Sequence, residues 1–95
     1  MFIILLRLSS NKARLGEFID GHNAWIRRGF EDGVFLLTGT IKPKQGGGIL
    51  AHATTPAELE KRIGEDPFVA ENVVTAEIIE IEPGRTEERL AFLGA

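Results

Sequence analysis

The sequence contains no cysteine, no excess of positive charge and no long apolar run. The lack of cysteine excludes disulfide bonds, thiolate nucleophiles and cysteine-ligated zinc. The first apolar run, residues 2–6, is too short for a membrane-spanning helix or for the hydrophobic region of a signal peptide. We therefore expect a cytoplasmic protein with no membrane association.

Basic residues are outnumbered, with 11 Lys and Arg against 14 Asp and Glu, and they are scattered along the chain. This balance argues against nucleic-acid binding. The glycine run 46–48 lacks the Lys-Ser/Thr and the following helix of a phosphate-binding loop. The serines and threonines lack the turn motif of a hydrolase nucleophile. A single domain over residues 1–95 is expected, with a core at about 1–83 and a tail at 84–95.

Segments typical of strands and helices alternate along the chain. Apolar, β-rich residues predict strands over 2–8, 34–40, 49–53 and 73–82, and helical periodicity predicts helices over 12–29 and 56–63. Gly29 is placed to end the first helix. Residues 42–48 suit a hairpin or a mobile loop, and residues 86–93 a short helical tail. The alternation slips at Ile78-Ile79, which predicts a bulge there or burial on both faces.

Local capping signals mark the second half of the chain. The segment 55–58, Thr-Pro-Ala-Glu, is a capping box with proline at the first helical position. Asp66 stands directly before Pro67, which favours extended backbone at the aspartate, and it is well placed to cap a further helical turn.

The resulting order, βαββαβ, is the ferredoxin-like pattern of the α+β class. We expect a four-stranded antiparallel sheet with two helices on one face. Strand residues 2–6 and 34–37 are apolar on both faces, so a single copy would expose a large apolar patch. A second copy packed sheet to sheet, forming a homodimer, would cover it.

His22 is the one titratable position in the apolar stripe of the first helix, which contains Leu15, Phe18 and Ile19 at helical spacing. A polar ring on a buried face needs a hydrogen-bond partner. Asp66 is one candidate, and the pair would then act as an acid–base dyad. Alternatively, His22 is a core histidine bonded to a backbone carbonyl, and Asp66 only caps the turn at Pro67.

Three stretches together resemble the YCII-related (YciI-like) family. They are residues 1–6, residues 22–25 followed by 33–39, and residues 66–70 before the last strand. The resemblance covers about residues 1–83 and implies a dimeric α+β barrel with a His-Asp pair at the active site, at positions matching His22 and Asp66. Members of the family often have proline where this chain has Thr40, so the pocket rim is expected to differ.

Other residues are candidates for contacts with a substrate. They are Arg7, Thr38, Gly39, Thr40 and Phe68. The glycine loop 46–48 could form a lid, with Lys42 and Lys44 attracting an anion. His52 could complete a metal site with His22 and Asp66, but its spacing is not diagnostic, and we expect neither metal nor cofactor.

These features predict a small cofactor-independent enzyme of the lyase or isomerase type. His22 would serve as general acid and base, oriented by Asp66, on a small organic molecule such as an anionic or cyclic one. The reaction would be proton transfer, isomerisation or elimination. The alternative is a non-catalytic dimeric module that binds a small molecule or serves a partner protein.

Overall fold

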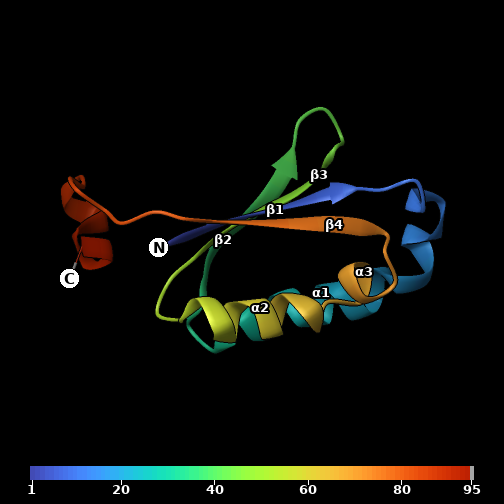
Figure 1. Ribbon diagram of the computed structural model, residues 1–95, viewed down its shortest axis with the longest axis horizontal. Coiled ribbons are helices and arrows are strands. Elements are labelled where there is room, and N and C mark those ends of the chain that lie inside the picture. The colour runs from blue at the N-terminus through green and yellow to red at the C-terminus, as the bar shows by residue number, and fades with distance from the viewer. Residues whose placement is uncertain (95) are drawn as a thin grey trace.

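Four strands form one antiparallel sheet, and the α-helices cover one face of it (Figure 1). The computed structural model describes residues 1–94. The strands are β1 (Phe2–Leu8), β2 (Phe35–Ile41), β3 (Gly46–Ala51) and β4 (Val74–Glu80), in the order β2-β3-β1-β4. The helices are α1 (Leu15–Glu31), α2 (Pro56–Gly64) and α3 (Pro67–Ala70), with 3-10 turns η1 (Lys12–Arg14) and η2 (Glu88–Gly94). The predicted ferredoxin-like α+β fold is confirmed, with α3 as an added helical turn before β4.

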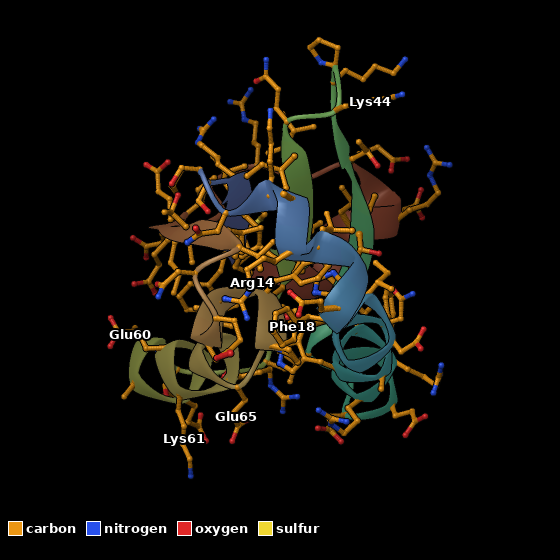
Figure 2. All side chains as sticks on the ribbon, turned by 90° about the vertical axis from the view of Figure 1, so that its right-hand side faces the viewer. Arg14, Phe18, Lys44, Glu60, Lys61 and Glu65 are labelled. Atoms are coloured by element: carbon orange, nitrogen blue, oxygen red, sulfur yellow. The ribbon has the colours of Figure 1, made fainter. Side chains whose placement is uncertain are left out.

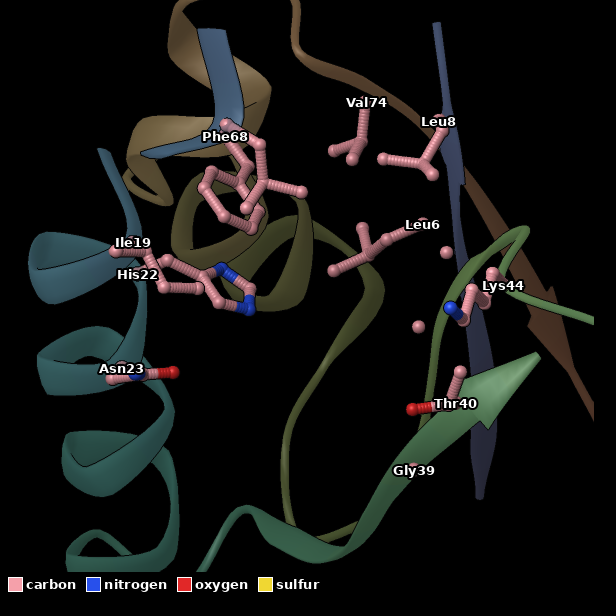
Figure 3. Close-up of a pocket in the computed structure, with 13 residues that line it drawn as sticks. Leu6, Leu8, Ile19, His22, Asn23, Gly39, Thr40, Lys44, Phe68 and Val74 are labelled. Carbon is pink, nitrogen blue, oxygen red and sulfur yellow. The ribbon is translucent and has the colours of Figure 1, made fainter. Parts of the chain in front are cut away.

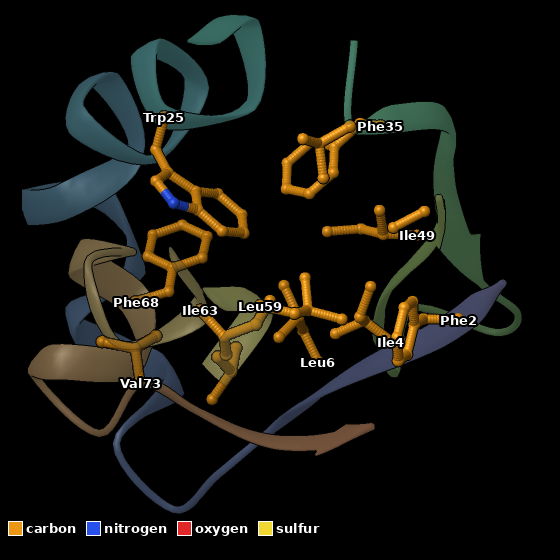
Figure 4. Close-up of a cluster of buried hydrophobic side chains, with 13 residues drawn as sticks. Phe2, Ile4, Leu6, Trp25, Phe35, Ile49, Leu59, Ile63, Phe68 and Val73 are labelled. Carbon is orange, nitrogen blue, oxygen red and sulfur yellow. The ribbon is translucent and has the colours of Figure 1, made fainter. Parts of the chain in front are cut away.

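The hydrophobic core lies between the sheet and the helices (Figure 4). Phe2, Ile4 and Leu6 alternate along β1 and are buried beneath the helices, so β1 presents one regular face to the core. Trp25 of α1 is also buried, and its indole Nε1 donates to the backbone oxygen of Arg62 at 2.9 Å. This bond satisfies the ring nitrogen and fixes α1 against the end of α2.

The first helix differs from its predicted bounds at both ends. Residues 12–14 form the 3-10 turn η1, and α1 continues past Gly29 to Glu31. Gly29 does not end the helix because it serves packing: a Cβ there would lie 2.0 Å from a ring carbon of Phe35. The turn after α1 instead uses Gly33, whose φ of +73° favours glycine.

The predicted loop 42–48 is shorter than expected. Its three glycines belong to β3, and residues 42–45 alone make the turn. Gly46 has a φ of +132°, and a Cβ there would lie 1.9 Å from the backbone oxygen of Leu6. The close approach of two backbones, rather than flexibility, therefore requires glycine, and a lid formed by residues 46–48 is not observed.

A register shift lies in β2, not in β4. β4 pairs with β1 without interruption, so the bulge predicted at Ile78-Ile79 is wrong, and Ile79 is exposed in the single chain. The shift falls between Phe35 and Leu37, which turns Leu37 away from the core. The sheet face opposite the helices, which we call the outer face, carries Ile3, Leu5, Leu37, Leu50 and Ile79.

In the second half of the chain, α2 and α3 begin where the capping signals predict. Thr55 and Glu58 form the predicted capping box at the start of α2, and Asp66 caps α3. β3 and β4 end at Ala51 and Glu80, two residues earlier than predicted. In the tail, Leu90 and Phe92 of η2 stay largely exposed. No helix within residues 1–94 is long and apolar enough to span a bilayer.

The turn between β2 and β3 lies away from the helical layer. Figure 2 shows Lys44 on this turn, while Glu60 and Lys61 lie on the solvent side of α2. Lys44 adopts a left-handed conformation with a φ of +49°.

Candidate functional site

His22 and Asp66, 44 residues apart in sequence, form a hydrogen-bonded pair. His22 Nδ1 lies 2.8 Å from Asp66 Oδ1. The aspartate is fully buried, and the histidine side chain is 15% exposed. Since a carboxylate only accepts hydrogen bonds, Nδ1 is the donor, and the neutral ring then carries its lone pair on Nε2. The imidazole is therefore held in the tautomer that can accept a proton on the nitrogen away from Asp66.

The two oxygens of Asp66 have different surroundings. Oδ1 accepts both from His22 and from the backbone N–H of Phe68, at 3.0 Å. Oδ2 is buried and has no hydrogen-bond partner within the described chain. Asp66 is thus both the hydrogen-bond partner of His22 and the cap of α3, and the same oxygen, Oδ1, makes both contacts.

Packing of α3 on α1 sets the position of this pair. A Cβ at Gly21 would lie 3.1 Å from Pro67 Cγ, so the small residue before His22 lets the two helices approach closely. Phe68 then stacks on the imidazole, with ring centroids 4.0 Å apart and planes inclined by 10°. One face of the His22 ring is covered by this contact, which restricts the ring to one orientation.

The imidazole borders a hollow of about 320 Å³ between α1 and the sheet (Figure 3). Aliphatic side chains form most of its wall: Leu6, Leu8, Leu15, Ile19 and Val74. The polar side chains are His22, Asn23, Thr40 and Lys44, and no carboxylate of residues 1–94 lines the hollow. Figure 3 shows His22 and Asn23 extending from α1 toward the strand that carries Thr40. The site resembles a ligand pocket, with apolar walls and a few convergent polar groups.

A second hollow, of about 240 Å³, adjoins the first on the β2 side. His22, Asn23 and Thr40 line both hollows, and Thr38 lines only the second. Thr38 and Thr40 pair with Ile49 and Gly47 of β3 and share the helix-facing side of the sheet. The predicted candidates Thr38, Gly39, Thr40 and Phe68 therefore all lie near His22.

Arg7 is not brought to this cluster. It follows the buried Leu6 in β1, so its side chain starts on the outer face, where its guanidinium lies 3.6 Å from Glu77. Both partners are about half exposed. Within the single chain Arg7 is a half-exposed charge near the end of β1, and its prediction as a residue close to His22 is not supported.

Two polar residues at the hollow carry weak sequence signals or none. Asn23 is an exposed polar residue beside His22, and nothing in its spacing marks it. Lys44 is indicated only by its place in a loop, and its partners depend on how that loop folds over β1. His52 lies elsewhere, with its ring 5.5 Å from that of Phe92. Within residues 1–94, no three His, Cys, Asp or Glu side chains lie together as a metal site would require.

Comparison with known proteins identifies the fold but no sequence family. No protein-family model matches the chain, and no curated protein sequence matches it. Among solved structures, it is similar to 5-chloro-2-hydroxyhydroquinone dehydrochlorinase (TftG) from Burkholderia phenoliruptrix AC1100, in complex with 2,5-dihydroxybenzoquinone. The TM-score is 0.69 at 14% sequence identity, over 88% of this chain and 96% of that chain. A match at this identity establishes a shared α+β fold.

Proposed function

We propose that the protein is a small cofactor-independent enzyme that moves a proton on a small cyclic organic molecule. His22 acts as general base and then as general acid through Nε2, and Asp66 orients the ring and stabilises the imidazolium. The reaction class is elimination or isomerisation. Neither needs a covalent nucleophile.

The observation that carries this proposal is the position of His22. One ring nitrogen is bonded to a fully buried carboxylate, and the ring borders a hollow large enough for a small organic molecule. A histidine that served only the core would be enclosed on all sides. The same arrangement of carboxylate, imidazole and open pocket recurs where histidine transfers protons.

The structural neighbour supports the choice of chemistry. It is named a dehydrochlorinase, an enzyme of elimination, and its bound molecule is a single hydroxylated ring. The resemblance of residues 1–6, 22–25, 33–39 and 66–70 to the YciI-like family also favours a His-Asp active site. We therefore infer that this chain is a member of that family.

The outer face favours assembly as a homodimer. Leu37 is 58% exposed and Ile79 is 38% exposed, and the half-buried Ile3, Leu5 and Leu50 lie between them on the same face. None of the α-helices in residues 1–94 covers this side of the sheet (Figure 1). A second copy packed face to face would bury the patch on both chains and close a dimeric α+β barrel.

Turnover is the first test of the enzyme proposal. The wild-type protein is incubated with 5-chloro-2-hydroxyhydroquinone and with a panel of other hydroxylated ring compounds, and release of chloride and of protons is followed. We expect at least one compound to be converted faster than in protein-free buffer. Binding at the hollow without conversion of any compound would instead support the non-catalytic module.

Gly47 offers a way to close the hollow without touching His22. It faces the helices between Leu6 and Thr40, and a Cβ there would meet only Gly39 O, at an ordinary 3.5 Å. Gly47→Val should therefore fold, since valine suits a strand, and should place its methyl groups in the hollow. We expect affinity for 2,5-dihydroxybenzoquinone, measured by titration calorimetry, to fall by roughly tenfold or more because of the steric clash.

The matched control is Gly48→Ala. Gly48 is the next residue of β3. Its backbone borders the second hollow, but a Cβ there would lie on the outer face and would meet nothing within 4 Å. Its affinity should equal that of the wild-type protein. Equal affinities of both variants and the wild type would show that the ligand binds outside the hollow.

A further inference from the structure

We propose that the hollow at His22 continues past Lys44 into a cationic recess, and that the natural ligand carries a carboxylate that binds there. The inference rests on the proposed function, because it extends the same pocket. It names the substrate as a small organic acid with an apolar segment, held with its charged end away from His22.

The recess is a separate hollow of about 310 Å³ at the end of β1. Six residues line it: Arg7, Leu8, Ser9, Lys12, Lys44 and Gln45. Three of them are cationic and none is acidic, in a chain where acidic residues outnumber basic ones by 14 to 11. This concentration of positive charge creates a local potential that attracts anions.

Two residues connect the recess with the hollow at His22. Leu8 and Lys44 line both. Figure 3 shows the ammonium of Lys44 directed toward the space between α1 and the sheet. A ligand could therefore place an apolar ring among Leu6, Leu8 and Ile19 and reach the cations with a short chain.

The cations of the recess are available to a ligand. Lys12 and Lys44 form no ion pair within residues 1–94, and Arg7 is only loosely paired with Glu77, at 3.6 Å. An exposed pair of this kind contributes little to stability, so exchanging it for a ligand carboxylate has a small cost. The side-chain hydroxyl of Ser9 donates to the backbone oxygen of Asn72, so the cations and the side-chain amide of Gln45 are the groups of the recess that would recognise the ligand.

The experiment compares acids with their neutral amides. The probes are benzoate, phenylacetate, 3-phenylpropanoate and 4-phenylbutanoate, each paired with its amide, so that the distance from ring to carboxylate varies. Binding is followed by chemical shift changes in ¹⁵N- and ¹³C-labelled protein. We expect at least one acid to bind about tenfold more tightly than its amide, with changes at Lys12, Lys44 and His22 together, and to weaken as salt is raised.

Charge-removing variants assign the effect to the recess. Lys12→Gln and Lys44→Gln should each weaken binding of the acid by about fivefold and leave binding of the amide unchanged. The control is Lys42→Gln, which removes the same charge from the same turn, because Lys42 lines neither hollow. Its affinity for the acid should match that of the wild type.

The outcomes separate this proposal from the proposed function. If no acid exceeds its amide, including the case in which neither binds, the carboxylate recess is wrong. Amides that still shift His22 would then leave the pocket and its acid–base role intact. If acids bind at Lys12 and Lys44 without changing His22, and Gly47→Val does not affect them, the recess binds anions independently and the continuous groove is wrong.

Discussion

His22→Gln is expected to lower turnover by about 10²–10⁴-fold while the protein stays folded, as is typical for loss of a general base. Glutamine has a side-chain amide that can donate to Asp66 Oδ1, so the buried carboxylate need not lose its partner. It has no basic nitrogen, so it cannot accept the proton. Steady-state rates and a thermal melt of the same preparations provide the measurement.

Asp66→Asn is the informative companion variant. Both hydrogen bonds of Asp66 converge on Oδ1, so an asparagine oxygen in that place keeps His22 Nδ1 as a donor and keeps the cap on Phe68 N–H. Its NH₂ group then replaces the buried Oδ2, which has no partner, and this should cost about 1–3 kcal/mol of stability. Turnover should fall less than in His22→Gln, because the ring remains and only the charge beside it is lost.

One result would contradict the acid–base role of His22, and another would change the role assigned to Asp66. Unchanged turnover in folded His22→Gln would remove His22 from the chemistry. A loss of turnover in Asp66→Asn equal to that in His22→Gln, together with a ring that NMR finds protonated on Nε2, would mean that the asparagine amide has turned and reversed the tautomer. Asp66 would then act through hydrogen-bond direction rather than through charge.

The fold could be predicted because its determining signals are local. The capping box at residues 55–58, the Asp66-Pro67 step and the apolar run of β1 each fix an element within a few residues. The predicted element bounds were wrong where a residue distant in the sequence determines the local structure. Gly46 is a glycine within a strand because a Cβ there would clash with Leu6 O, and Gly29 is a glycine within a helix because a Cβ there would clash with Phe35. Glycine composition alone predicts loops and helix ends at both places.

The candidate site was predictable only in part, for a similar reason. A histidine in an apolar helical stripe signals a buried partner, and the resemblance to the YciI-like family implied that this partner is Asp66. The side of the sheet on which a strand residue lies is harder to predict. Because β1 is apolar on both faces, its sequence does not show which of its residues face the helices. Only the structure shows that Leu6 lies in the core, and therefore that the next residue, Arg7, faces away from His22. The position of Lys44 is equally hard to predict, because it depends on the path of the turn after β2.

Leu37→Glu is expected to convert the proposed homodimer into a monomer. The register shift in β2 places Leu37 on the outer face opposite Leu50, at the β2 edge of the apolar side chains that a second copy would cover. At 58% exposed it is also the most exposed of these side chains. An unpaired carboxylate in such an interface costs several kcal/mol, so the dimer dissociation constant should rise by about 10²-fold or more. Sedimentation equilibrium of wild type and variant over a range of concentrations measures this change.

Thr38→Glu is the matched control, since it introduces the same charge one residue further along the same strand. Thr38 pairs with Ile49 and faces the helical side, so this variant should self-associate as the wild type does. If both variants dissociate, a charge on either side of β2 disrupts the dimer, and the result does not assign the interface to the outer face. If the wild type is monomeric at every concentration, the patch formed by Ile3, Leu5, Leu37, Leu50 and Ile79 is not a homodimer interface, and the pocket at His22 belongs to a single chain.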